Sequence, residues 1–518
     1  MYMRSARVRD AKRLLPAAVA AVGLGLSAAF LAATPAAAVA PAAATAATVA
    51  APSAPRSLTA TAYPTHRTAN VTWIAPATAG STRVQTYYLR TSTANSTTSF
   101  SKWVAVTGTK FTVGGLSANA SYLVQVRARN ATSLSPVATL KFREVDVVPA
   151  APPAPVAVPI PVPANAKSVL AFGAVGNGVT DDTAAIQRAL NSLAPGDTLV
   201  FPAGRTFAHA GTITVGQAGV RLTGGATLLA TKEQTSMVLL NNNNIHVDNL
   251  TFKMASTTKR WSAYEQMKLR LRGFSGITLT DVKVDGSAAA GIYIGGARNF
   301  TLTRVTVQNT RADAIHMTEG ASYGTVTDAV VRNPGDDGVA VVSYAGDGDV
   351  PSTNITVVRP RVFNQTWGRA FSVVGGTNIT YRNVYAERSS AAAIYIAAEA
   401  NWHTYPVSNI LVDGATINYA NQTAAVDHGA VMLYNGESGV TNHDITVRNV
   451  RITKTRTDAS REVAILNDSG AQQSRLTVEN VSFNGGPHTA FTTNAPASSY
   501  RLSGWTDDGK TLPAKVGW

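Results

Sequence analysis

Alternating apolar and polar residues form short, repeated stretches along the second half of the chain. Residues 244–252 and 299–307 show the pattern, with Ile, Leu, Val or Phe alternating with polar residues in each half of the stretch. Such alternation predicts β-strands that bury one face. Starting from Ile245, equivalent positions recur after 32, 23, 24, 31, 24, 31, 35 and 31 residues. A repeat of this size is typical of a solenoid, in which successive coils bury one continuous core.

A second apolar stretch follows in the repeats, at 291–294, 314–317, 338–341, 370–373, 393–396 and 430–433. Aligning these stretches gives a ladder of residues at the strand entrance: Ala290, Asp313, Asp337, Arg369, Ala392 and Gly429. One place earlier, the ladder reads Ala289, Ala312, Asp336, Gly368, Ala391 and His428. Because neighbouring strands of a solenoid lie about 4.8 Å apart, we expect Asp313, Asp336 and Asp337 to converge.

These three aspartates form an unusual cluster, called the acidic trio below. Carboxylates that close together are costly, because like charges raise one another's pKa. The polar residues of the ladder are confined to the middle coils and give way to Ala and Gly on both sides. A structural ladder would continue along the solenoid. The trio therefore indicates catalysis or a cation site.

The segments before the solenoid differ in composition. Residues 1–40 combine a basic start, an apolar run and small residues suited to cleavage, which predicts a secretory signal peptide. Residues 41–51 are rich in Ala, Thr and Pro and are expected to be disordered. Residues 52–143 show the short alternating segments of an antiparallel β-sandwich. The proline-rich residues 144–167 predict an extended linker that holds this small domain away from the solenoid at 168–518.

Two stretches carry a resemblance to known folds. The sandwich resembles a fibronectin type III domain, with Trp73 in a core strand and Tyr122 at the corner position. Residues 169–190 resemble the start of a β-helix of the pectate lyase and rhamnogalacturonase type, where Asp181 or Asp182 caps a helix that plugs the solenoid. The implied fold class is all-β: a right-handed, single-stranded parallel β-helix, preceded by a small fibronectin type III β-sandwich.

The acidic trio resembles the active site of β-helical glycoside hydrolases: the polygalacturonase family 28, the dextranase family 49 and the α-1,3-glucanase family 87. The matching residues are Asp313 and the Gly335-Asp336-Asp337 motif. This resemblance implies that Asp336 protonates the leaving oxygen while Asp313 and Asp337 activate water, which gives inversion. Inverting enzymes usually separate acid and base by roughly 6.5–9.5 Å, and stacked aspartates should be closer, so Asp313 and Asp337 must both act on the water.

Two departures from the polygalacturonase pattern bear on the substrate. Gly368-Arg369-Ala370 stands where those enzymes carry Gly-His-Gly, and 394–397 lacks their cationic Arg and Lys. A uronic acid would therefore lack its main anchor. Aromatic residues suggest stacking on neutral sugar rings: Tyr293, Trp367, Tyr395, Trp402 and Tyr405. We expect an endo-acting α-glucanase with an α-1,3-glucan-like substrate, bound by His316, Arg369, Tyr395, Glu399 and Trp402.

Composition limits the kinds of site and partner that we expect for the protein. The chain has no cysteine, which excludes disulfides and thiolate metal sites. The formal net charge is +15, but no basic cluster resembles a nucleic-acid patch. Beyond the signal peptide, no apolar stretch is long enough to span a bilayer. We expect a secreted, extracellular monomer that binds a polysaccharide, needs no cofactor or metal, and contacts neither nucleic acid nor membrane.

Three other functions stay open on the sequence. The positive charge and Arg369 suit a pectinase of the polygalacturonase or rhamnogalacturonase type. A calcium-dependent polysaccharide lyase would use the aspartates as metal ligands and Arg369 as the base. The fibronectin-like module and the solenoid would also serve a non-catalytic wall-binding protein.

Overall fold

The structure is a computed structural model of the chain. It describes residues 49–63, 68–93, 96, 98–116, 120–143, 151–153, 156, 160–346, 348–487 and 489–516. The predicted signal peptide 1–40, residues 41–48 and much of the predicted linker lie outside these residues. The chain divides into two compact units.

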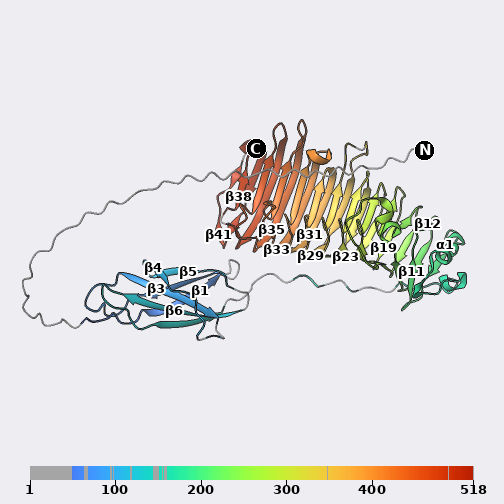
Figure 1. Cartoon of the computed structure of the whole chain (residues 1–518). Coiled ribbons are helices and arrows are strands. Elements are labelled where there is room, and N and C mark those ends of the chain that lie inside the picture. The colour runs from blue at the N-terminus through green and yellow to red at the C-terminus, as the bar shows by residue number, and fades with distance from the viewer. Residues whose placement is uncertain are drawn as a thin grey trace, which may run out of the picture. The chain divides into compact units, whose positions relative to one another are not determined.

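The first unit is a β-sandwich of two antiparallel sheets (Figure 1). One sheet contains β1 (Arg56–Tyr63), β2 (Thr68–Ile74) and β5 (Lys110–Val113), and the other contains β4 (Val104–Val106), β3 (Thr86–Thr93), β6 (Ser121–Arg129) and β7 (Ala138–Arg143). Burial alternates along β6, where Val124, Val126 and Ala128 are fully buried. Trp73 packs 5.4 Å from Tyr87 in this core. The predicted sandwich is therefore confirmed.

The second unit is a long parallel β-helix, seen in Figure 1 as a stack of strands with α1 at one end. Helix α1 (Thr183–Asn191) buries Ile186 and Leu190 in the core of the first coils. Asp181 accepts a hydrogen bond from the Thr183 amide, whereas both oxygens of Asp182 accept amides from Val175 and Gly176. Asp182 thus stands at the N-cap position but makes no side-chain capping bond and holds the preceding turn instead, while Asp181 binds the first amide of the helix.

Most coils contribute one strand to a sheet of 11 parallel strands, and this sheet carries the polar ladder. Its strands are β12 (Ile213–Val215), β15 (Val238–Leu240), β18 (Leu269–Arg272), β21 (Ile292–Gly295), β24 (Ile315–Thr318), β27 (Val339–Val342), β30 (Phe371–Val374), β32 (Ile394–Ala398), β34 (Val431–Asn435), β36 (Val463–Asn467) and β38 (Phe491–Thr493).

The remaining strands form a 24-stranded sheet. In chain order they are β8 (Lys167–Ser168), β9 (Asn177–Asp181), β10 (Thr198–Val200), β11 (Thr206–His209), β13 (Arg221–Thr223), β14 (Thr227–Ala230), β16 (His246–Asp248), β17 (Thr251–Met254), β19 (Thr278–Thr280), β20 (Lys283–Ser287), β22 (Thr301–Thr303), β23 (Thr306–Thr310), β25 (Ser322–Thr327), β26 (Val330–Arg332), β28 (Thr353–Val358), β29 (Arg361–Phe363), β31 (Gly376–Glu387), β33 (Val407–Asn418), β35 (Thr441–Thr453), β37 (Gln472–Asn484), β39 (Tyr500–Ser503), β40 (Thr506–Asp507), β41 (Lys510–Thr511) and β42 (Lys515–Val516).

The first stretch of each early repeat, expected as one strand, is two short strands separated by a bend. The bend residues Asn249, Asp281 and Arg304 have left-handed φ values of 50°, 53° and 53°. A residue in this conformation turns the chain, so 244–252 becomes β16 and β17 instead of one straight strand. The sequence pattern missed the bend because the apolar side chains on both sides still face the core.

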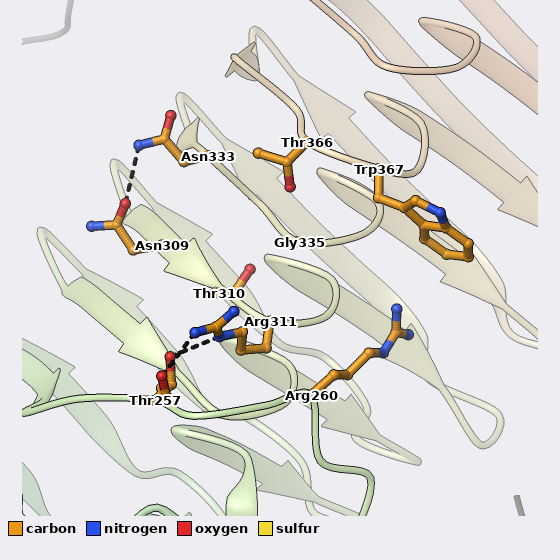
Figure 2. A pocket seen from close by; sticks show the side chains of 9 residues that line it. All are labelled: Thr257, Arg260, Asn309, Thr310, Arg311, Asn333, Gly335, Thr366 and Trp367. Atoms are coloured by element: carbon orange, nitrogen blue, oxygen red, sulfur yellow. Dashed lines mark hydrogen bonds between the residues drawn. The ribbon is translucent and has the colours of Figure 1, made fainter. Parts of the chain in front are cut away.

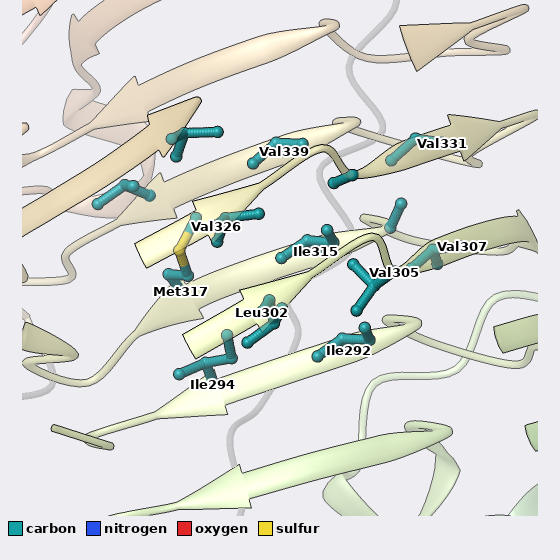
Figure 3. Close-up of a cluster of buried hydrophobic side chains, with 14 of the residues drawn as sticks. Ile292, Ile294, Leu302, Val305, Val307, Ile315, Met317, Val326, Val331 and Val339 are labelled. Carbon is teal, nitrogen blue, oxygen red and sulfur yellow. The ribbon is translucent and has the colours of Figure 1, made fainter. Parts of the chain in front are cut away.

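The core runs along the axis of the β-helix. Figure 3 shows Ile292, Ile294, Ile315, Met317 and Val339 facing inward from successive strands. Because side chains alternate along a strand, the residues between them face outward: Tyr293 pairs with His316, His316 with Ala340, Ala340 with Ser372, and Ser372 with Tyr395. These outward-facing side chains form a continuous surface along the sheet, where a substrate could bind.

Proline-rich residues near the start of this unit contact the β-helix. Arg361 donates a hydrogen bond to the Pro152 carbonyl, and Arg221 donates to the Pro161 carbonyl. The spacing between the two units stays a prediction. Among the described residues, no helix has the length and apolar character needed to cross a membrane.

Candidate functional site

The acidic trio lies where the chain enters two neighbouring strands of the 11-stranded sheet. Asp313 precedes β24, and Asp336 with Asp337 precedes β27. The Ala314 amide donates a hydrogen bond to the Asp337 carbonyl at 2.9 Å, so the backbone ladder holds the two coils in register. One carboxylate oxygen from each aspartate lies within 4.8 Å of the others. The structure thus brings together the three carboxylates that the ladder placed side by side.

Asp313 is held in its charged form by its neighbours. Its Oδ2 lies 2.5 Å from His316 Nδ1, and its Oδ1 accepts the Asp337 amide at 2.9 Å. Burial opposes ionisation, but the hydrogen bond and charge of His316, the charge of Arg260 and the Asp337 amide bring the pKa of Asp313 below its ordinary value. His316 therefore contacts the trio directly, as part of an Asp–His pair.

Asp337 is the most enclosed of the three, with 5% of its side chain exposed. It accepts hydrogen bonds from the Arg369 amide at 2.7 Å and from the Ser372 hydroxyl at 2.5 Å. The Arg369 guanidinium lies 3.2 Å away. Burial raises the pKa of Asp337, and the charge of Asp313 adds to the rise, while Arg369 and Ser372 act against it.

Asp336 has the most perturbed carboxyl group of the trio. Its Oδ2 lies 2.7 Å from Nη2 of Arg260, a residue absent from the predicted site. Burial, followed by the charges of Asp313 and Asp337, raises the pKa of Asp336 to about 8, although Arg260 and Arg369 act in the opposite direction. Asp336 is therefore mostly protonated at neutral pH, the state that a proton donor requires.

Gly368 supports the two adjacent acids from the next coil. A Cβ atom at this position would lie 2.3 Å from Asp336 Oδ1 and 2.5 Å from Asp337 Oδ1. Both distances are shorter than real Cβ contacts, so a side chain here would displace the carboxylates. The polar ladder has glycine at this position because the acids fill the space.

A polar cluster lies on the C-terminal side of the trio. Arg369 bridges from Asp337 to Glu399, whose Oε1 is 3.4 Å from Arg369 Nη2. The Tyr395 ring lies between the Arg369 guanidinium, at 4.4 Å, and the parallel His428 ring, at 5.3 Å. Only 4% of Tyr395 is exposed. The prediction that Tyr395 offers a face to a sugar ring is therefore wrong, because both faces are already covered.

A second polar cluster, which the sequence did not predict, lies on the N-terminal side. The hydroxyls of Tyr264 and Tyr293 donate to Glu319 Oε1 at 2.7 and 2.6 Å. The Arg270 guanidinium stacks 3.6 Å over the Tyr264 ring and lies 3.9 Å from Glu319. Tyr293 also stacks on His316 at 5.2 Å, and the Arg270 guanidinium lies 5.7 Å from its ring, so the buried ring has little surface left for a sugar. The ladder could have indicated Arg270 and Tyr293, since they are paired in register next to His316.

Two tryptophans remain available for stacking, because Trp367 and Trp402 are each 60% exposed. Trp402 closes the short 3₁₀ helix η4 (Ala400–Trp402) that follows Glu399. His403 is exposed and lies 3.8 Å from Glu437. The predicted substrate-binding residues Arg369, Glu399 and Trp402 thus occupy one side of the trio, while their role in binding stays a prediction.

A cleft of about 720 Å³ opens beside the trio. It is lined by Arg260, Asn309, Arg311, Asn333, Trp367 and four smaller residues. Figure 2 shows the Arg260 guanidinium pointing toward the Trp367 indole across the cleft. Arg311 donates two hydrogen bonds to Thr257, and Asn333 donates one to Asn309. The cleft joins the trio at Arg260, which contacts both.

Among the residues that the structure describes, the trio is the group of acidic side chains close enough together to hold a metal ion. Four of its six oxygens already accept hydrogen bonds from His316, Ser372 and two backbone amides. A fifth, Asp336 Oδ2, is paired with Arg260. Calcium prefers six to eight oxygen ligands, so the donor set fits an acid–base site better than a calcium site.

Comparisons with known proteins agree with this architecture. The profile described as rhamnogalacturonase A/epimerase, pectate lyase-like, matches residues 166–395, and the fibronectin type III profile matches residues 53–141. A search of curated proteins returned no match.

Solved structures are similar to this chain at low sequence identity. The catalytic domain of a GH87 α-1,3-glucanase in complex with tetrasaccharides is 14% identical, with a TM-score of 0.52, over 82% of this chain and 87% of that one. The family 28 exopolygalacturonase of Yersinia enterocolitica is 14% identical, with a TM-score of 0.45, over 89% and 100%. The A-module of the Azotobacter vinelandii mannuronan C-5 epimerase AlgE6 is 18% identical, with a TM-score of 0.49, over 67% and 100%. The chain therefore carries a pectate lyase-like β-helix domain with a fibronectin type III domain at its N-terminal side, and it shares its fold with the catalytic domain of the α-1,3-glucanase.

Proposed function

We propose that the protein is an exported glycoside hydrolase that cleaves a neutral glucan at the acidic trio. The observation that supports this most strongly is the contrast between two carboxyl groups a few ångströms apart. Burial and like charges raise the pKa of Asp336 to about 8, while His316 helps to bring the pKa of Asp313 below its ordinary value. A protonated acid beside an ionised base is the arrangement that glycoside hydrolysis requires.

In the proposed reaction, Asp336 donates its proton to the leaving glycosidic oxygen. Asp313, charged and oriented by His316, accepts a proton from the attacking water, and Asp337 helps to position that water. Neither Asp313 nor Asp337 has an oxygen without a hydrogen bond. This engagement favours water activation over direct attack by a carboxylate on the sugar.

The stereochemical outcome follows from the same assignment. Direct attack of water gives inversion, although the carboxylates lie closer than the roughly 6.5–9.5 Å usual for inverting enzymes. The first-formed anomer, read by proton NMR before mutarotation, tests the assignment. A product that keeps the substrate's anomeric configuration would make one of the aspartates a nucleophile.

A neutral substrate is favoured by the charges around the trio. Arg260 is paired with Asp336, Arg369 with Asp337 and Glu399, and Arg270 lies near Glu319. Because each of these three guanidinium groups already has a carboxylate partner, none of them is an unpaired anchor for the carboxylate of a uronic acid. An uncharged glucan, with α-1,3-glucan as the first candidate, needs no such anchor.

The test compares wild type with Asp336→Asn on α-1,3-glucan, dextran and polygalacturonate. Wild type is expected to release reducing sugar from a neutral glucan, and the variant to lose about 10²–10⁴-fold in rate with an unchanged far-ultraviolet circular dichroism spectrum. Retained activity would remove Asp336 from the mechanism. Unsaturated products that form only with calcium would identify a lyase. Release of reducing sugar from polygalacturonate would identify a pectinase, and binding without any product would identify a wall-binding protein.

A further inference from the structure

Arg260 contacts a side chain of the acidic trio from outside the strand ladder. It lies between β17 and the 3₁₀ helix η3 (Tyr264–Gln266), in a loop without regular structure. Its Nη2 lies 2.7 Å from Asp336 Oδ2, yet 49% of the side chain is exposed. An ion pair with one partner half in solvent is weakly held, since water competes for the guanidinium.

The backbone on both sides of Arg260 is fixed. Arg311 donates to the hydroxyl and the carbonyl of Thr257, each at 2.8 Å, and the Thr258 amide donates to Glu233 at 2.9 Å. On the other side, the Trp261 amide donates to the Ala288 carbonyl at 2.9 Å. A change at Arg260 is therefore a rotation of its side chain and not an opening of the loop.

The ion pair with Arg260 would hinder Asp336 from donating a proton to the substrate. A glycosidic oxygen must come within about 3 Å of a carboxyl oxygen of Asp336 to receive its proton. Oδ1 lies against Gly368, and the guanidinium of Arg260 lies at Oδ2. The cleft beside the trio gives the guanidinium room to leave, and the Trp367 ring, 5.8 Å from it, offers a new partner. Figure 2 shows Arg260 already directed toward this ring.

We propose that Arg260 is a displaceable counter-ion of Asp336. It pairs with the Asp336 carboxyl group while the site is empty, and the arriving sugar chain moves it into the cleft toward Trp367. Arg260 is thus a positioning residue, which favours the charged form of Asp336 without substrate and leaves when the proton is needed. This inference rests on the proposed function, because it takes Asp336 as the general acid.

A pH effect follows from the displacement. The charged and titratable groups that face Asp336 are Asp313, Asp337, Arg260, Arg369 and Tyr344. Of the two cations, only Arg260 has a side chain exposed enough to move, since 17% of the Arg369 side chain is exposed. Loss of the Arg260 charge makes the Asp336 carboxylate less stable, so the acid keeps its proton to higher pH.

The test uses Arg260→Met, with Arg260→Lys as the charge-preserving variant. Arg298→Met is the matched control, because Arg298 is exposed and lies over Tyr323, outside the trio. Both kcat/KM and kcat are measured against pH. The fall of kcat/KM at high pH (its basic limb) reports the pKa of the acid in the free enzyme, and the basic limb of kcat reports the pKa of the acid in the substrate complex. In wild type, the kcat limb should lie about one pH unit or more above the kcat/KM limb. In Arg260→Met both limbs should lie at the higher value, while Arg260→Lys and Arg298→Met resemble wild type.

Coincident limbs in wild type, or an Arg260→Met profile equal to that of wild type, would overturn the inference while leaving the hydrolase assignment intact. A second readout does not need turnover: the ¹³C carboxyl resonance of Asp336, assigned by its loss in Asp336→Asn, is titrated in wild type and in Arg260→Met. Equal pKa values would again overturn the inference. A higher pKa in Arg260→Met, without hydrolysis of any glucan, would support the ion pair and refute the proposed function.

Discussion

Replacement of Gly368 by alanine should damage catalysis while leaving the fold intact. The new Cβ would start 2.3 Å from Asp336 Oδ1 and 2.5 Å from Asp337 Oδ1. Real Cβ contacts are rarely shorter than 3.0 Å, so the two carboxylates must move by at least 0.7 and 0.5 Å. A misplacement of about 1 Å can cost about 100-fold in rate, so we expect kcat to fall on the order of 30- to 100-fold. Overpacking should cost about 1–3 kcal/mol of stability.

The assay measures kcat on the glucan that wild type cleaves best, with urea unfolding on the same samples. Gly216→Ala is the matched control, because nothing lies within 4 Å of a Cβ at that position. Neither glycine has a left-handed φ, so backbone strain does not separate them. A folded Gly368→Ala protein with a kcat within threefold of wild type would refute the claim that the packing of Gly368 sets the carboxylate positions.

Two further predictions concern single side chains. Lys268 is fully buried, with Nζ 3.0 Å from His209 Nε2 and 2.9 Å from the Ser236 carbonyl, and burial lowers the pKa of Lys268 to about 7. The unfolded chain holds that proton up to about pH 10.4, so this group makes stability rise with pH above 7. Relative to Lys268→Met, the free energy of unfolding of wild type, measured with urea, should increase by about 2 kcal/mol between pH 7 and 9. Profiles of stability against pH that run parallel for the two proteins would contradict this. Trp402→Ala should raise KM about tenfold and leave kcat nearly unchanged if the exposed ring stacks on a sugar, and an equal KM would exclude that contact.

The repeat architecture could be predicted from the sequence because every coil obeys the same constraint. Ile292, Ile315 and Val339 must all face the core, and this fixes the register of the strands between them. Once the register is fixed, residues at equal offsets become neighbours, and Asp313 and Asp337 follow directly. Bends such as that at Asn249 were missed because they change the strand direction without changing which side chains face inward.

The residues missed by the sequence analysis come mostly from outside the repeat. Arg260 and Tyr264 belong to an insertion that has no equivalent position in neighbouring coils, so no alignment of strands could place them next to Asp336 or Glu319. Tyr395 was placed correctly on the ladder but assigned the wrong contact. The alignment gives its neighbours along the sheet, whereas the coverage of its ring depends on the directions of the Arg369 and His428 side chains.

The three aspartates show why residue type alone does not assign chemical roles. Asp313 receives a histidine, Asp337 receives a serine and a backbone amide, and Asp336 receives only an arginine that is half exposed to solvent. The fixed donors lower the pKa of Asp313 and act against the rise that burial causes in the pKa of Asp337, so the shared proton stays with Asp336, whose counter-ion is least firmly held. Because the three groups interact strongly, the proton belongs to the trio as a whole, and removal of any one donor should shift the titration of all three. The environment therefore divides three identical side chains into a proton donor and its partners, and the solenoid register makes that division possible.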